Sequence, residues 1–358
     1  MNIIKNAFTQ LKKTFTTTKY GLLQFSIILL VALLFIRLPQ NLLNDWDLNT
    51  NNYWTDIPNT YLNNPNLVYP PWGLILLFPY YLLHTEGARA LSVITIGWLA
   101  YNRKWSIAVF FLVVLSPYFL VTMTQSNMDI LVIVLPILVW KYSQGKKWET
   151  IARGLSLSVL LLKPQCTILL ILYLLWTNRA KWKKELIEIG IVGLIIIPIS
   201  LFGTPPLVLQ WLNNITHPSP QNQFYWSVNN VSLSARYSFW IALGTLVLIL
   251  SILFLIKKRG MITWKLDQTI SSLLLGSMFL LPYTSQQSLS AGLAFIPSWP
   301  GYIQQLLVLG VSLVLPSFHD NISFWTLLMA FFSLVFFCFS QTSKDGQPRT
   351  MDNNTSSS

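Results

Sequence analysis

Charged side chains are scarce in this chain of 358 residues, because Asp, Glu, Lys and Arg together make up only 10% of it while hydrophobic residues make up 53%. A soluble domain carries about 25% charged residues. Several apolar runs also approach the roughly 20 residues that cross a hydrocarbon core about 30 Å thick. The clearest of these runs are 21–39, 186–202, 237–256 and 322–340. The composition therefore predicts an all-α, polytopic membrane protein.

Cysteine and histidine are almost absent. Cys166 and Cys338 are the only cysteines, and both lie in apolar segments, as small core residues do. The three histidines are scattered and lack the spacing of metal ligands. We therefore expect no disulfide, no metal site and no cofactor.

Basic residues are missing from the two long polar loops, 40–68 and 203–235, although the chain has a formal net charge of +12. Most of its 24 lysines and arginines fall in short clusters between apolar runs. The positive-inside rule places such clusters in the cytoplasm and the two loops outside. The excess charge thus indicates topology, with attraction to anionic lipid as a secondary effect, and does not indicate nucleic-acid binding.

The N-terminal region has a basic stretch followed by an apolar run, as a signal peptide does. No small-residue cleavage site follows the run, so we expect a retained first helix. The tail 341–358 is polar and rich in Ser and Asn, which is typical of disorder. The sequence predicts one domain over 1–340 in the cell (plasma) membrane, with both termini in the cytoplasm.

In two segments the number of membrane crossings is decided by the need to keep all basic clusters in the cytoplasm. The clusters 141–153 and 179–184 flank "LSVLLLKPQCTILLILYLLW" (157–176), so two crossings, 153–162 and 166–177, must lie between them, with Lys163-Pro164-Gln165 as their outer turn. Proline fits a turn because it lacks an amide hydrogen. Segment 69–84 carries three prolines, and a crossing there would place Arg103 outside. We therefore expect a re-entrant or interfacial helix at 69–84 and the second crossing at 88–101.

The remaining predicted crossings complete the bundle. They are 105–122, 129–140, 186–202, 237–256, 266–283, 290–299, 302–316 and 322–340. The total is 12 helices, or 11 if the short segment 290–299 does not cross.

This topology gathers polar and ionisable side chains at the outer boundary, where charges are costly and mark functional sites. They are Asp45, Asp47, Tyr69, Asn127, Asp129, Lys163, Gln165, Asn229, Asn230, Arg236, Gln286 and Gln287. Such a set suits sugar transfer from a lipid phosphate: a carboxylate acts as general base, basic groups neutralise the leaving phosphate, and aromatics and amides match a sugar ring. Each residue alone has a simpler reading. The loop aspartates are then solvated, Lys163 is a snorkelling lysine, and Asn127 and Asp129 cap a helix.

The order of several motifs resembles the glycosyltransferase C superfamily, and within it family 87, the polyprenyl-phosphate-mannose-dependent transferases. The motifs are "NDW", "YPPWGLILLFP", "SPYFLVTMTQSNMDILVIVLP", "LLLKPQ", "NNVSLSAR" and "LLPYTSQQS". The resemblance implies a helical fold with a juxtamembrane helix starting at Tyr69. It also implies Asp45 or Asp47 as the base and Lys163 facing the donor phosphate. The chain departs from the family at Gln286 and Gln287, where members often carry paired histidines, and it lacks the usual glycine before Gln125.

The leading hypothesis is an inverting transferase that moves a hexose, plausibly mannose, from a polyprenyl phosphate to a glycolipid or glycan acceptor outside the cell. Lys163 and Arg236 hold the phosphate in this hypothesis. The residues that bind the sugar are Tyr69, Asn127, Asp129, Gln165, Asn229, Asn230, Gln286 and Gln287. Two alternatives stay open: a transporter or lipid flippase, and an inactive relative that serves as a partner subunit.

Overall fold

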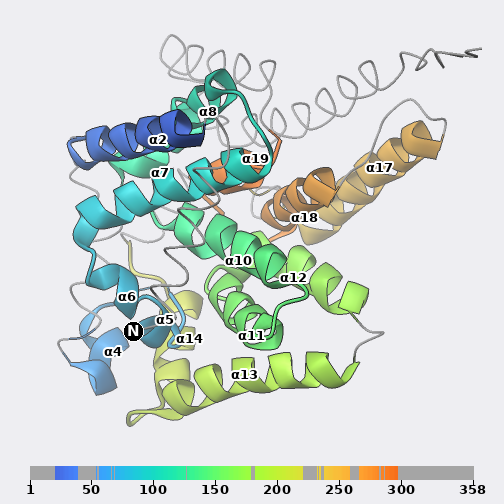
Figure 1. Ribbon diagram of the computed structural model, residues 1–358. Coiled ribbons are helices and arrows are strands. Elements are labelled where there is room, and N and C mark those ends of the chain that lie inside the picture. Colours follow the sequence, from blue (N-terminus) through green and yellow to red (C-terminus); the bar gives the residue numbers. More distant parts are fainter. Residues whose placement is uncertain are drawn as a thin grey trace, which may run out of the picture.

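The computed structural model describes residues 21–38, 54, 56–65, 67, 69–125, 127–178, 182–220, 232, 234, 238–258, 266–281, 284–285 and 287–296. Every regular element in these residues is a helix (Figure 1). The prediction of an all-α fold is therefore confirmed. The longest helices are α2 (Gly21–Ile36), α7 (His84–Asn102), α11 (Glu149–Leu160), α12 (Pro164–Asn178), α13 (Trp182–Leu201), α17 (Phe239–Lys258) and α18 (Leu266–Leu280).

The long helices pack in pairs that follow the chain order only in part. Helix α2 lies along α7, α11 lies between α10 (Leu135–Ser143) and α13, and α12 packs on α18 (Figure 1). Gly97 of α7 allows the first of these contacts, because a Cβ atom there would lie 2.6 Å from Cγ2 of Ile28. Gly154 has the same role between α11 and α13, where a Cβ atom would lie 2.8 Å from Cβ of Ile191.

The core centres on η2 (Ile130–Val134), a short π-helix whose five residues are all fully buried. It contacts α7, α11 and α19 (Ser288–Leu293) and continues directly into α10. Single π turns in proteins are rare and occur often at functional sites. The residue that precedes this π-helix is Asp129.

The hairpin predicted around Lys163 is confirmed. Helix α11 ends at Leu160 and α12 begins at Pro164, so Lys163 lies in the turn between them. Proline suits the first position of a helix because its fixed φ matches and its missing N–H is not needed there. The hydroxyl of Thr167 ties the turn together by donating to the carbonyls of Leu160 (2.7 Å) and Lys163 (3.0 Å). The side of a membrane on which this turn lies stays a prediction.

Two predicted helices are interrupted at prolines. Segment 69–84 forms two four-residue helices, α5 (Gly73–Leu76) and α6 (Phe78–Tyr81), with Pro79 in the first turn of the second. The single helix expected there is therefore wrong. The segment 105–122 likewise divides into α8 (Ile107–Val114) and α9 (Pro117–Thr124), which meet at 55°. The break falls where Ser116 caps α9 by accepting from the N–H of Phe119 and Pro117 begins it.

Two further expectations need correction. Part of the predicted outer loop 203–235 forms helix α14 (Leu207–Thr216), which packs against α4 (Thr60–Asn63) just after the 3₁₀ turn η1 (Ile57–Asn59). The expected crossing 290–299 overlaps only the end of α19, a helix of six residues that stops at Leu293 before the described residues end at 296. Six residues are too few to cross a bilayer. The crossings predicted at 302–316 and 322–340 lie outside the described residues.

Length and hydropathy can be examined for the described helices. None of them alone is both long enough and apolar enough to cross a membrane, whereas the bent pair α8 and α9 satisfies both conditions together. Shorter apolar helices cover Leu23–Ile36, Ile130–Ser143, Pro164–Thr177 and Phe239–Ile252.

Candidate functional site

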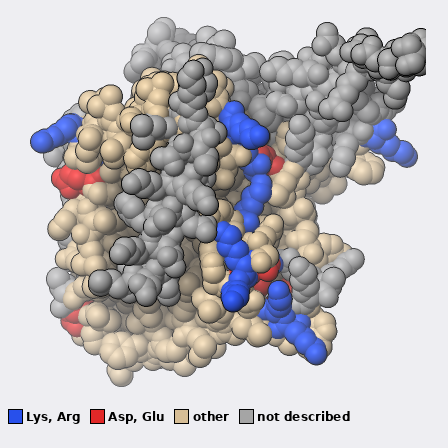
Figure 2. All heavy atoms as spheres, viewed as in Figure 1, with Lys and Arg blue, Asp and Glu red and all other residues tan. Residues whose placement is uncertain are grey.

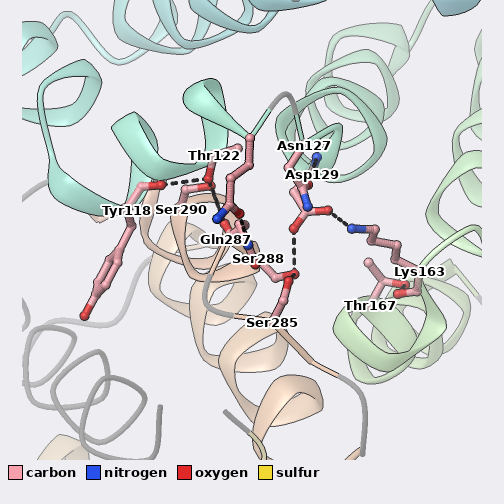
Figure 3. Close-up of polar contacts among 11 residues, drawn as sticks. Tyr118, Thr122, Asn127, Asp129, Lys163, Thr167, Ser285, Gln287, Ser288 and Ser290 are labelled. Atoms are coloured by element: carbon pink, nitrogen blue, oxygen red, sulfur yellow. Dashed lines mark hydrogen bonds and ion pairs between the residues drawn. The ribbon is translucent and has the colours of Figure 1, made fainter. Parts of the chain in front are cut away.

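Four separate segments bring a buried polar cluster together at one end of α11. We call it the Lys163 cluster. Asp129 comes from the start of η2, Lys163 from the α11–α12 turn, Ser288 from the start of α19, and Tyr69 from the segment before α5. Figure 3 shows Lys163 and Ser288 each reaching a different carboxylate oxygen of Asp129. The predicted topology groups Tyr69, Asp129 and Lys163, and in the structure Lys163 lies against both of the others.

Asp129 lies at the centre of the cluster and is fully buried. One of its carboxylate oxygens forms an ion pair with Nζ of Lys163, and the other accepts a 2.6 Å hydrogen bond from Oγ of Ser288. Its backbone N–H donates to Oδ1 of Asn127 over 2.9 Å. The carboxylate does not cap the helix that follows. The capping alternative is therefore wrong for Asp129.

Lys163 is also buried, with a relative exposure of 9%. Its ammonium group points into the protein, towards Asp129, and lies 5.4 Å from the centre of the Tyr69 ring. That distance is within the range of a cation–π contact. The snorkelling alternative is therefore wrong, because a snorkelling lysine keeps its charge in water. An ammonium has three donors, and among the described residues only Asp129 accepts a hydrogen bond from this one.

A second set of contacts fastens α19 to α9 next to the Lys163 cluster. Nε2 of Gln287 donates to Oε1 of Gln125, and the Thr122 hydroxyl donates to the Gln287 carbonyl over 3.1 Å (Figure 3). Oγ of Ser290 lies 3.0 Å from the same hydroxyl. Gln287 was expected to bind a sugar, and this role stays a prediction: its amide nitrogen is used within the protein, whereas its Oε1 has no hydrogen-bond partner among the described residues. The contacts fasten the end of α9 to the start of α19, where Ser288 lies.

Sequence reasoning missed two residues at this end of the molecule. One is Ser288. The other is Arg89 of α7, which is buried and donates to the carbonyls of Leu38 (2.7 Å) and Thr124 (3.4 Å). These carbonyls follow α2 and end α9, where the helix dipole favours a positive charge. The signal was present, because Arg89 is the only charged residue between Glu86 and Arg103.

The other predicted site residues lie apart from the cluster or outside the described chain. Gln165 is partly buried in the first turn of α12, and no hydrogen bond within the described parts of the chain joins it to Asp129 or Lys163. Six residues fall outside the described parts of the chain: Asp45, Asp47, Asn229, Asn230, Arg236 and Gln286. Their proposed roles stay predictions. In the part that the structure describes, no group of three or more His, Cys, Asp and Glu side chains lies in position to hold a metal ion.

A second buried group of charges lies at the other end of α11, and we call it the Arg153 network. Arg153 bonds Glu149 (3.0 Å) on its own helix and pairs with Glu188 (3.2 Å) of α13, and its guanidinium carbon lies 4.8 Å from the centre of the Trp140 ring. The half-exposed Lys184 reaches Glu149 over 3.5 Å. Figure 2 shows lysine and arginine side chains in a band down one face, with a few acidic side chains among them.

Within this network the contacts of Glu149 favour its ionised form. Burial alone would raise the pKa of its carboxyl group. Hydrogen bonds from the Arg153 side chain and the Gly145 N–H, together with the positive charges of Lys184 and Arg153, outweigh burial and hold that pKa below its ordinary value. Glu149 is therefore ionised, and its two carboxylate oxygens contact Arg153, Lys184 and the Gly145 N–H.

Comparisons with known proteins add no further guide to the site. No family model, no curated protein and no solved structure matches the chain.

Proposed function

We propose that this chain is a polytopic membrane glycosyltransferase, which moves a hexose from a polyprenyl phosphate to an acceptor on the extracytoplasmic face. The observation that carries the proposal is the buried Lys163 ammonium, whose three donors have one hydrogen-bond acceptor, Asp129, among the described residues. An anionic phosphate oxygen is the acceptor that would best occupy the remaining donors. The sequence resemblance points to the same role for Lys163.

The membrane part of the proposal is supported by large apolar side chains on the surface of the bundle. Leu34 of α2, Leu194 of α13 and Trp240 of α17 are each more than half exposed. Exposed apolar areas of this extent mark contact with membrane or protein. Together with the low charge content and the loops without basic residues, they favour lipid around the helices.

In the proposed reaction one carboxylate acts as the base and another positions Lys163. The acceptor hydroxyl oxygen attacks the anomeric carbon, the bond from that carbon to the phosphate oxygen breaks, and the hydroxyl proton passes to the base. The polyprenyl phosphate leaves with one more negative charge, which Lys163 stabilises. Asp129 is unsuited as the base because both of its oxygens already accept hydrogen bonds. Its role is to hold Lys163 in place, and Asp45 or Asp47 is the base.

The test is transfer of radiolabelled hexose from polyprenyl phosphate to a membrane lipid extract by the purified protein. We expect Asp45→Asn or Asp47→Asn to abolish transfer. Asp56→Asn is the matched control, because Asp56 accepts hydrogen bonds from Asn59 (3.1 Å) and Asn63 (3.0 Å) in the same loop and so has a local role. Transfer that survives in both of the first two variants would rule out the assigned base.

One observation favours a transporter as the second candidate. The break between α8 and α9 and the π-helix η2 resemble the discontinuous helices that line transport sites. The Lys163 cluster, however, lies at helix ends and in a turn, which is more typical of a site at a membrane surface. Uptake or lipid scrambling by the protein in proteoliposomes, without a covalent product, would reverse this ranking.

A further inference from the structure

Helix α14 turns two amide side chains towards the protein and two of its three leucines outwards. Leu207, Gln210 and Asn214 are buried, whereas Leu209 and Leu212 are 55% and 43% exposed. A helix on the surface of a water-soluble protein has the opposite arrangement, with its apolar stripe inwards. The outward leucines therefore need an apolar neighbour.

The inward amides bind backbone carbonyls of the first long loop. Nε2 of Gln210 donates to the carbonyls of Pro58 (2.8 Å) and Pro205 (2.7 Å). Nδ2 of Asn214 donates to the carbonyls of Tyr61 (3.1 Å) and Asn64 (3.2 Å). The ring of Trp211 meets that of Trp72 at 5.8 Å. These contacts fix the rotation of α14 about its axis, so the direction of the leucines is set by the fold.

The surroundings of α14 identify the apolar neighbour as lipid. Residues 189–235 contain no Asp, Glu, Lys or Arg, so nothing in this stretch favours a charged partner. Leu201 and Phe202, at the end of the neighbouring helix α13, are also exposed and extend the apolar surface towards Leu194. In Figure 1, α14 lies beside the end of α13 and next to α4.

We propose that α14 lies in the membrane surface as an interfacial helix, with Leu209 and Leu212 inserted among the lipids of an uncharged leaflet and its amides holding the first long loop. Interfacial helices bury an apolar side about 5–10 Å into the headgroup and acyl boundary. This inference rests on the membrane placement proposed above. It adds a lipid contact that hydropathy alone does not predict, since the helix has only ten residues.

The experiment places an environment-sensitive NBD label at single cysteines in the full chain, reconstituted in phosphatidylcholine vesicles. The variants are Leu209→Cys, Leu212→Cys and the matched control Asn213→Cys, whose exposed side chain lies at the polar edge of the outward side, between the directions of Leu209 and Gln210. All variants carry Cys338→Ser, and the buried Cys166 is retained. The same protein without an introduced cysteine, treated with the label in the same way, measures the background signal from Cys166. Leu194→Cys, 77% exposed on α13, reports the membrane placement itself.

We expect nitroxide-labelled phosphatidylcholine to quench the Leu209 and Leu212 labels strongly, while iodide in water quenches the Asn213 label. Quenching at Leu194 without quenching at Leu209 and Leu212 overturns the inference for α14 alone. Protection of Leu209 and Leu212 from both quenchers shows a protein partner and also overturns it. Lack of lipid quenching at Leu194 overturns the membrane placement and this inference with it.

Discussion

Two buried groups of charges lie at opposite ends of α11, and they differ in the carboxylates and segments that they combine. In the Arg153 network one guanidinium faces two carboxylates and an aromatic ring, and the charges come from two packed helices, α11 and α13. In the Lys163 cluster one ammonium faces one carboxylate and the Tyr69 ring, and the residues come from four separate segments. Both basic groups keep donors without a hydrogen bond among the described residues, namely Nε and Nη2 of Arg153 and two of the three donors of Lys163. The first arrangement fastens two helices together, and the second contains the donors that the proposed function assigns to a phosphate.

The largest expected effect is on the Lys163 cluster. Lys163→Met leaves the carboxylate of Asp129 buried with only the hydroxyl of Ser288 as its side-chain partner, and we expect a loss of about 3–5 kcal/mol in the free energy of unfolding. Adding Asp129→Asn removes the isolated charge and should restore most of the stability. Thermal unfolding in detergent measures both. A double variant as unstable as Lys163→Met would contradict the buried ion pair between Lys163 and Asp129.

Arg153→Met tests whether the other network is purely structural. Two buried carboxylates lose their partner, so we expect a loss of about 3 kcal/mol. The folded fraction should keep its rate of sugar transfer, because the Arg153 network lies at the far end of α11 from Lys163. Loss of transfer in folded Arg153→Met protein would remove the distinction between the two groups.

Acid should weaken the Arg153 network through Glu149. The pKa of its carboxyl group is lower in the folded protein than its ordinary value of 4.5. Its ionised form therefore stabilises the fold above pH 4.5, and this contribution is lost as the pH falls through the lower, folded-state pKa. Melting temperatures measured between pH 7 and pH 3 should drop less steeply for Glu149→Gln than for the wild type. Equal slopes would show that Glu149 does not make the stabilising contacts with Arg153, Gly145 and Lys184 described above.

The smallest effect is expected at Lys184, whose side chain is half exposed at the edge of the Arg153 network. Lys184→Gln should change the free energy of unfolding by no more than about 1 kcal/mol, because water screens exposed ion pairs. The same melting experiment checks it. A loss as large as that of Arg153→Met would mean that the network extends to the surface.

The sequence was sufficient to predict the elements that charge and composition determine. The hairpin at Lys163 followed from the two flanking basic clusters, and Asn127, Asp129 and Lys163 were placed at one end of the bundle. The ion pair between Asp129 and Lys163 was not predicted. It joins residues 34 positions apart through the packing of η2 against α11, and a π turn is set by tertiary contacts more than by local preference.

Helix α14 and the break between α8 and α9 were not predicted, although the sequence contains a pattern for each of them. Helix α14 was assigned to a loop because its stretch contains amides and no charges, although apolar residues recur at Leu209, Leu212 and Ile215 with helical spacing. The break between α8 and α9 falls at Ser116-Pro117, a helix-starting pair that occurs inside an apolar run. Ser288 could not be found, since a serine near a helix start carries no signal of a partner 159 residues away.

The most direct test of the account is sugar transfer by the Asp129→Asn/Lys163→Met double variant, compared with the wild type at equal amounts of folded protein. We predict that the wild type transfers labelled hexose from polyprenyl phosphate. The double variant should melt near the wild-type temperature and transfer none. Transfer at the wild-type rate by the double variant would show that the ammonium serves the fold alone.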